Sequence, residues 1–303
     1  ANCQRLELLR IAANRLEALP DWLLGLPRLA WLAYAGNPFS DEQECRLGET
    51  ATAAEIPWQA LTLGEQLGQG ASGVIHRAAL RSDEGTQGVA VKLFKGAMTS
   101  DGLPRCEMAV SLAAGRHPNL IGVAGRVSGH PSGMPALVMT LIDPGFVNLA
   151  GPPSLDSCTR DVYPADLTFT PDALLAMAQG VASAALHLHE RGILHGDLYA
   201  HNLLHSVQEQ GRVLLGDFGA ASCYDGTDRE RAARLERLEV RAFGCLLEEL
   251  LARCHPRDEA LGALHSLAEA CLLEAVLQRP SFAEILARID AVATTMAAEP
   301  ACA

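Results

Sequence analysis

The 303-residue chain has few aromatic residues, few basic ones and no long apolar run. Aromatic residues make up only 5% of a chain that is 49% hydrophobic, so the core must be built mainly from Ala and Leu. Lys and Arg number 24 against 36 Asp and Glu, for a formal net charge of −12, which argues against the basic face that nucleic acids and anionic membranes require. No apolar run approaches the ~20 residues that cross a bilayer. The sequence therefore predicts neither nucleic-acid binding nor a membrane span.

The cysteines show no pairing pattern. They number nine, which is odd, and no CxxC motif occurs. In a chain of this length this usage indicates reduced thiols in a cytoplasmic setting, and it does not favour disulfides or a zinc site. The chain shows no signal peptide and begins with Ala instead of Met, so a missing N-terminal portion stays open. We expect a cytoplasmic protein.

Residues 1–40 contain a repeat. Five positions recur after 23 residues, because Leu6, Leu9, Ile11, Asn14 and Leu16 correspond to Leu29, Leu32, Tyr34, Asn37 and Phe39. This pattern resembles the end of a leucine-rich repeat array, in which apolar side chains line the core and Asn satisfies backbone groups of a turn. The alternative is a Leu-rich amphipathic helix. We expect a repeat segment over 1–40 that can bind a protein ligand, then an acidic connector over 41–57.

A glycine-rich turn follows the connector. The segment ALTLGEQLGQGASGVIHRAAL predicts two strands around the pattern GxGxxG, formed by Gly68, Gly70 and Gly73. Alone this pattern is weak, since any hairpin can use glycines. A further strand, VAVK, ends in Lys92, and Glu107 follows 15 residues later in a helical stretch. No helix starts directly after the glycines, which excludes a Rossmann dinucleotide site.

Two acidic motifs stand further along the chain. HGDLYAHN contains Asp197 and Asn202, and GDFG places Asp217 20 residues after Asp197. Taken alone, Asp197 and Asn202 could be ordinary turn residues. Together the three side chains offer two carboxylates and one carboxamide, the oxygen ligands that Mg²⁺ prefers beside phosphates. The spacing therefore indicates phosphate chemistry.

These motifs, in this order, resemble those of a protein kinase. HPNL after the helical stretch, LEVRAFG and the late RPSF segment extend the resemblance over roughly residues 60–290. It implies an α+β, two-lobed fold over residues 58–297. The small lobe, 58–141, would be an antiparallel sheet with one helix, and the large lobe, 146–297, would be mainly helical.

The resemblance also implies roles for individual residues. Lys92 would bind the ATP phosphates and Glu107 would hold Lys92; Asp197 would accept the proton of the substrate hydroxyl. Asn202 and Asp217 would bind Mg²⁺. The implied ATP-binding residues are Gly68, Gly70, Gly73, Ile75, Ala90, Lys92, Met139 and Leu204.

Several positions depart from the family. Gly196 stands where an Arg usually receives an activation-segment phosphate, so control by that route should be absent. Tyr199 and His201 replace cations that the loop commonly carries near the transferring phosphate, and Ser111 replaces an apolar side chain. The segment between Asp217 and the next helix is short, and its hydroxyl residues Ser222, Tyr224 and Thr227 are expected to be exposed.

The predicted function is ATP- and Mg²⁺-dependent transfer of the γ-phosphate to a protein substrate, on Ser or Thr in preference to Tyr. One alternative is a nucleotide-binding pseudokinase that serves as a scaffold through its repeats. Another is a small-molecule phosphotransferase of the aminoglycoside or choline kinase type, because HGDLxxxN also resembles the loop of those enzymes. Any control is expected to act through the helix of Glu107 or through the repeat segment.

Overall fold

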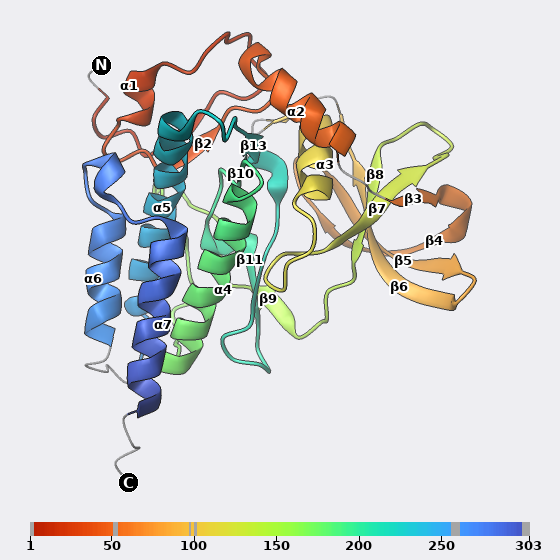
Figure 1. The fold of residues 1–303 in the computed structure, drawn as a ribbon. Helices are drawn as coiled ribbons and strands as arrows, with labels where there is room; N and C mark the ends of the chain where they lie inside the picture. The colour runs from red at the N-terminus through yellow and green to blue at the C-terminus, as the bar shows by residue number, and fades with distance from the viewer. Residues whose placement is uncertain (1–2, 51–53, 97, 100–101, 256–260, 299–303) are drawn as a thin grey trace.

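A computed structural model describes residues 3–50, 54–96, 98–99, 102–255 and 261–298 (Figure 1). A six-stranded sheet with one helix forms a small lobe, and four long helices dominate a large lobe, which confirms the predicted α+β, two-lobed architecture. Within these ranges no helix combines the length and the apolarity needed to cross a membrane.

The small lobe is built on the sheet of order β3-β7-β8-β6-β5-β4. All neighbours pair antiparallel except β3 and β7, which are parallel. Val91 and Val138 are fully buried in its apolar core, within runs of consecutive buried residues on β6 and β8. The elements are β3 (Ala54–Pro57), β4 (Leu61–Gln69), β5 (Gly73–Ser82), β6 (Gly85–Phe94), α3 (Pro104–Ala113), β7 (Val123–Ser128) and β8 (Ala136–Thr140).

The large lobe packs its helices around α4. This helix starts at Pro171, and the hydroxyl of the preceding Thr170 accepts a hydrogen bond from the backbone N–H of Ala173. Two small sheets, β12-β11-β9 and β10-β13, lie beside it. The elements are β9 (Phe146–Asn148), α4 (Pro171–His189), β10 (Ile193–Leu194), β11 (Leu203–Ser206), β12 (Val213–Leu215), β13 (Ser222–Cys223), α5 (Arg229–Leu251), α6 (Gly262–Cys271) and α7 (Phe282–Ala298).

The N-terminal segment contains two short parallel strands. It consists of β1 (Leu8–Arg10), α1 (Asp21–Leu24), β2 (Trp31–Ala33) and α2 (Pro38–Thr50). Leu8 on β1 lies opposite Trp31 on β2, 23 residues later, which equals the spacing of the repeated sequence positions. This segment crosses the top of the large lobe in Figure 1.

A fully buried Asn37 connects the turns of this segment. Its amide nitrogen donates to the carbonyl oxygens of Ile11 and Tyr34 at 2.9 and 2.7 Å. Its amide oxygen accepts from the backbone N–H of Leu16 at 3.1 Å. The side chain therefore satisfies backbone groups from both copies of the repeated pattern.

The N-terminal segment shares its core with the large lobe. Its buried leucines form one apolar cluster with Leu235 and Leu238 of α5. Trp31 belongs to the main core of the large lobe. Because each of these clusters contains side chains from both parts, the N-terminal segment and the large lobe share one continuous core.

The described residues of the predicted connector at 41–57, which exclude 51–53, instead form regular structure. Its first part belongs to α2, which packs on α3 and lies above it in Figure 1, and its last part is β3 of the small-lobe sheet. Glu44 on α2 is buried and accepts hydrogen bonds from the Gly36 backbone N–H and the Ser40 hydroxyl. The Cys106 thiol of α3 donates to the other Glu44 oxygen at 2.7 Å. The acidic composition of this stretch did not predict a packed helix, because the residue that makes its buried contacts is a glutamate, Glu44.

Candidate active site

A glycine-rich hairpin between β4 and β5 closes one side of the site. The backbone N–H of Gly70 donates to the Gly73 carbonyl at 2.9 Å. Gly73 has no room for a side chain, because an added Cβ would lie 2.5 Å from the carbonyl oxygen of Leu93. At Gly68 and Gly70 no atom lies within 4 Å of such a Cβ, so those glycines leave open space beside the hairpin.

A buried ion pair joins the sheet to α3. Lys92 on β6 and Glu107 on α3 are 9% and 4% exposed, and the Lys92 ammonium donates to Oε1 of Glu107. Burial raises the pKa of Glu107, while the charge and hydrogen bond of Lys92 act against that increase. The Ser111 hydroxyl donates to the Glu107 carbonyl at 2.7 Å, so this buried polar side chain is satisfied within its own helix. The predicted Lys–Glu pair is thus formed.

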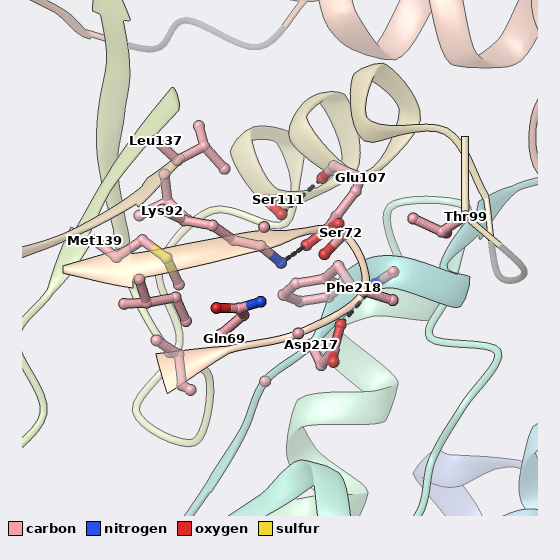
Figure 2. A pocket seen from close by; sticks show the side chains of 18 of the residues that line it. Gln69, Ser72, Lys92, Thr99, Glu107, Ser111, Leu137, Met139, Asp217 and Phe218 are labelled. Carbon is pink, nitrogen blue, oxygen red and sulfur yellow. Dashed lines mark hydrogen bonds and ion pairs between the residues drawn. The ribbon is translucent and has the colours of Figure 1, made fainter. Parts of the chain in front are cut away.

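The ion pair borders a cavity of about 370 Å³ (Figure 2). This volume lies in the range of ligand pockets, roughly 300–1,000 Å³. Polar side chains of Lys92, Glu107 and Asp217 and apolar ones of Leu137 and Met139 all face it. The predicted ATP-binding residues that line it are Gly70, Gly73, Ile75, Lys92 and Met139.

Three predicted ATP-binding residues, Gly68, Ala90 and Leu204, do not line this cavity. Ala90 lies on β6 two residues before Lys92 and is paired with Met139 of β8, and both of these neighbours line the cavity. Leu204 is paired with Asn148 across β11 and β9. The sequence did not single out the following lining residues: Gln69, Ala71, Ser72, Thr99, Ile121, Val123 and Asn148.

The loop after β10 brings Asp197 and Asn202 together. A 3₁₀ turn over Ala200–Asn202 lets the Asn202 amide nitrogen donate to the Asp197 carbonyl at 2.8 Å and to Asp197 Oδ2 at 3.1 Å. The carbonyl of Asn202 accepts from the Gly216 N–H at 3.0 Å. Because Gly216 directly precedes Asp217, this bond holds the two predicted metal ligands on neighbouring segments.

Buried side chains support this loop from the core. The His195 ring, fully buried, lies with Nε2 2.8 Å from the Gly216 carbonyl, as expected for a residue that organises the loop. Glu239 on α5 is also buried and accepts from the Gly196 backbone N–H at 2.8 Å and from His189 Nε2 at 2.7 Å. Contacts with Gly216 and with α5 therefore fix the two residues directly before Asp197.

Asp217 has an unusual backbone conformation. Its φ of 56° and ψ of 82° lie in the left-handed region, which is uncommon for residues other than Gly and is found at functional sites. Oδ1 accepts from the Gly219 N–H at 3.1 Å, and the side chain faces the cavity (Figure 2). The neighbouring Phe218 is buried with its ring 5.3 Å from that of His195.

The Asp197 carboxylate is largely removed from water. Burial raises its pKa, although the charges of Arg10 and His201 oppose that change. Arg10 donates to Oδ1 at 3.4 Å, and His201 Nε2 lies 3.9 Å from Oδ2. The carboxylate is therefore a stronger base than an exposed Asp and still has cations beside it.

His201 is paired with Asp161, a residue from the irregular stretch before α4. The imidazole Nδ1 lies 2.8 Å from Asp161 Oδ1, and the His201 backbone N–H donates to Oδ2 at 3.1 Å. Burial lowers the pKa of His201, but the hydrogen bond and charge of Asp161 outweigh it, so the pKa is raised overall. His201 therefore carries its positive charge to higher pH than a free imidazole.

The donor set fits Mg²⁺. Asp217 supplies a carboxylate and Asn202 an amide oxygen, since the amide nitrogen of Asn202 is used on Asp197. In the described part of the chain, no group of three or more His, Cys, Asp or Glu could hold a metal by itself. Mg²⁺ characteristically binds through one or two protein oxygens plus substrate phosphates. The ion would supply charge neutralisation on those phosphates.

Two residues of the N-terminal segment reach this loop, and the sequence did not predict either contact. Besides the Arg10 contact on Asp197, Trp31 stacks on Tyr199 with ring centroids 4.1 Å apart and planes 7° apart. The Trp31 indole N–H donates to the Leu198 carbonyl at 3.1 Å. Residues 10 and 197 are 187 positions apart, and no local spacing carries a signal for such a contact.

The hydroxyl residues after Asp217 differ from the expectation that all are exposed. Ser222 is fully buried and accepts from the Tyr34 backbone N–H. Tyr224 is 8% exposed, and its hydroxyl donates to Glu236. Thr227 alone of the three is exposed. The cause is the N-terminal segment, which covers the start of this stretch.

Residues 61–243, more than half of the chain, match the family model of protein tyrosine and serine/threonine kinases. The chain belongs to this protein kinase family. The match begins at the first strand of the glycine-rich hairpin and ends in α5, so it includes the ion pair, the loop of Asp197 and Asp217. This kinase membership does not favour the aminoglycoside or choline kinase alternative.

This kinase is similar to several curated proteins, two of which are named serine/threonine-protein kinases. The serine/threonine-protein kinase PITSLRE of Drosophila melanogaster is 28% identical over 59% of this chain and 18% of its own length. The serine/threonine-protein kinase CTR1 of Arabidopsis thaliana is 26% identical over 81% of this chain and 29% of its own. A fibroblast growth factor receptor of Strongylocentrotus purpuratus is 26% identical over 78% and 29%. The chain spans less than a third of the length of each of these relatives.

Proposed function

We propose that this chain transfers the γ-phosphate of ATP, with Mg²⁺, to a Ser or Thr hydroxyl of a protein substrate. One observation carries the proposal: the closed Lys92–Glu107 pair and Asp217 face one cavity, and Asp217 is tied through the Gly216–Asn202 hydrogen bond to Asp197. The names of the serine/threonine kinase relatives support the choice of hydroxyl.

The proposed reaction assigns a role to each of these side chains. The substrate hydroxyl oxygen attacks the γ-phosphorus, the bond from that phosphorus to the β–γ bridging oxygen breaks, and ADP leaves with that electron pair. Asp197 accepts the hydroxyl proton, as its raised pKa and position on the loop suit. Lys92 neutralises phosphate charge, while Asn202 and Asp217 would hold Mg²⁺. Ile75 and Met139 would contact adenine, flanked by Ala90 and Leu204, with the glycine-rich hairpin over the phosphates.

Mass spectrometry of the protein and of generic acceptor proteins after incubation with Mg²⁺ and ATP tests this function. We expect new phosphate on Ser and Thr. Within the stretch after Asp217, Thr227 is open to modification, whereas Ser222 and Tyr224 should stay unmodified because they are buried. ATP in EDTA is the matched control.

A nucleotide-binding scaffold remains the second candidate, because Arg10 already contacts the Asp197 carboxylate. Thermal stabilisation by Mg²⁺–ATP without phosphate incorporation into any acceptor would establish the scaffold and contradict the transferase.

We also propose that residues 1–40 are part of a leucine-rich repeat array. The 23-residue offset of β1 and β2 and the Asn37 hydrogen bonds support this. Replacing Asn37 with Ala should lower the free energy of unfolding by about 1–3 kcal/mol, because it leaves buried backbone groups unsatisfied. Urea titration measures this, with Asn14→Ala as the control, since Asn14 is exposed and bonds only to the nearby Ile11 and Ala12 carbonyls. Equal losses in both variants would contradict the assigned role of Asn37.

The binding of a protein ligand by this segment and a cytoplasmic location stay predictions. The buried leucines face the large lobe, so a ligand would have to use the exposed side, where Trp22 is 54% exposed. Photo-crosslinking from position 22 in cells that yields no protein adduct would contradict a ligand there.

A further inference from the structure

Arg10 is held next to the point of phosphate transfer by a strand from outside the matched kinase region. It ends β1 and pairs with Ala33 of β2. β2 is in turn fixed to the large lobe by Trp31, through the Tyr199 stack and the Leu198 carbonyl. The backbone of Arg10 is therefore positioned by regular hydrogen bonding and an aromatic contact, although its side chain is 34% exposed.

The loop itself does not supply a permanent cation there. Position 199 holds a Tyr that is 4% exposed, and among the described residues its hydroxyl has no hydrogen-bond partner. His201 also lies in this loop, but its imidazole Nδ1 is bonded to Asp161 at 2.8 Å. An arginine guanidinium, in contrast, is a fixed positive charge with five donors.

The contact between Arg10 and Asp197 suits a residue that changes partner. One guanidinium nitrogen lies 3.4 Å from Oδ1, longer than the 2.7–2.9 Å of a strong charge-assisted bond. A guanidinium offers five donors in a planar fork, so it can turn toward phosphate oxygens while staying beside the carboxylate. The carboxylates of Asp197 and Asp217 and the phosphates of ATP are all negative. A positive charge at this point would offset the repulsion between them.

We propose that Arg10 is the phosphate-facing cation of this kinase, supplied by the N-terminal segment in place of a loop residue. The inference rests on the proposed function. As the acceptor oxygen bonds to the γ-phosphorus and ADP leaves, the Arg10 guanidinium donates to an equatorial oxygen of the transferring group. The hydroxyl proton goes to Asp197, and Arg10 keeps its own protons throughout.

Steady-state kinetics of Arg10→Ala test the inference. We expect kcat to fall about 10–100-fold and KM for ATP to change little. Removing one preorganised donor usually lowers kcat by about 10²–10³, and the loss should be smaller here because Arg10 is partly exposed. Arg10→Lys should recover part of kcat, since it keeps the charge but not the fork. Arg15→Ala, an exposed arginine of the same segment, should match the parent protein. Unchanged kcat in Arg10→Ala would overturn the inference, and so would increased kcat, which would show that Arg10 blocks Asp197.

A binding measurement separates this inference from the proposed function. Mg²⁺–ADP with fluoroaluminate imitates the transferring group, and Arg10→Ala should weaken its binding about 10-fold or more while binding of Mg²⁺–ADP alone stays the same. If the parent protein transfers no phosphate but shows this selective loss, the proposed function fails and the Arg10 site stands. If it transfers phosphate and Arg10→Ala loses neither kcat nor fluoroaluminate affinity, the function stands and the Arg10 site fails.

Discussion

Asp197→Asn is expected to lower kcat about 10³-fold, within the roughly 10²–10⁴ that a positioned general base contributes. Asn has the same shape, and its single oxygen can accept from either Arg10 or Asn202, which contact different oxygens of Asp197. The Asn202 amide also keeps its bond to the backbone carbonyl of residue 197, so folding and the affinity for Mg²⁺–ATP should change little. The carboxamide cannot accept the substrate proton, which removes the base alone. Steady-state kinetics and thermal unfolding measure the two effects, with Asp83→Asn, at an exposed hairpin residue, as the control.

The pH dependence of kcat sharpens this prediction. Burial raises the pKa of Asp197 above the ordinary 3.8, and the base is active only when ionised. Activity of the parent protein should therefore fall on the acid side, around an apparent pKa above 3.8. Asp197→Asn should lose this acid limb and keep only a low residual rate. A variant that retained both the limb and most of kcat would show that another group accepts the proton.

Gly196→Arg, which restores the residue common in the family, is expected to lower the free energy of unfolding by about 2–5 kcal/mol. Gly196 has a φ of +76°, and an added Cβ would lie 2.5 Å from the Ala220 carbonyl oxygen and 3.0 Å from that of Leu32. One of these atoms belongs to the segment after Asp217 and the other to β2. The first cannot move without disturbing the 3₁₀ turn at Phe218–Ala220 and the second without disturbing β2, so the substitution should also loosen the N-terminal segment.

Gly226→Arg is the matched control, because Gly226 is exposed and no atom lies within 4 Å of an added Cβ. Urea titration with Trp fluorescence would follow both variants. Equal stability of the two variants would contradict the close approach of β2 at position 196. From the sequence we related the absence of Arg at position 196 to regulation. The structure gives another reason, because the backbones of Ala220 and Leu32 leave no space for a side chain there.

The sequence predicted the parts of the site that depend on local pattern. The strand of Lys92, the helix of Glu107 and the loop from Asp197 to Asn202 each have a short motif, and each lies in the expected kind of element. The order of these motifs was enough to imply a two-lobed fold. Their mutual placement follows from that fold, as the Lys92–Glu107 pair confirms.

The remaining features depend on contacts between distant segments. Asp161 lies in an irregular stretch that has no periodicity, yet it is the partner of His201. The first part of the predicted connector is α2, which the buried Glu44 fixes to its neighbours. A search for hydrophobic periodicity does not detect a helix whose buried contact is made by a carboxylate. Ser222 was expected to be exposed because its own segment is loop-like, but it is paired with Leu194 and its hydroxyl accepts from the backbone N–H of Tyr34 in the N-terminal segment. Such burial is a property of the assembled chain.

The same long-range packing has a consequence for how the chain folds. The Trp31 indole bonds to a carbonyl 167 positions later, and the buried Arg279 side chain donates to the Pro27 carbonyl 252 positions earlier. Residues 1–40 leave the ribosome well before their partners on α5 and around Arg279, which follow much later in the chain. Their leucines therefore lack these core partners until the later residues have been translated. Such high contact order slows folding and leaves apolar surface open to aggregation, so this segment is where a chaperone would have the most to protect.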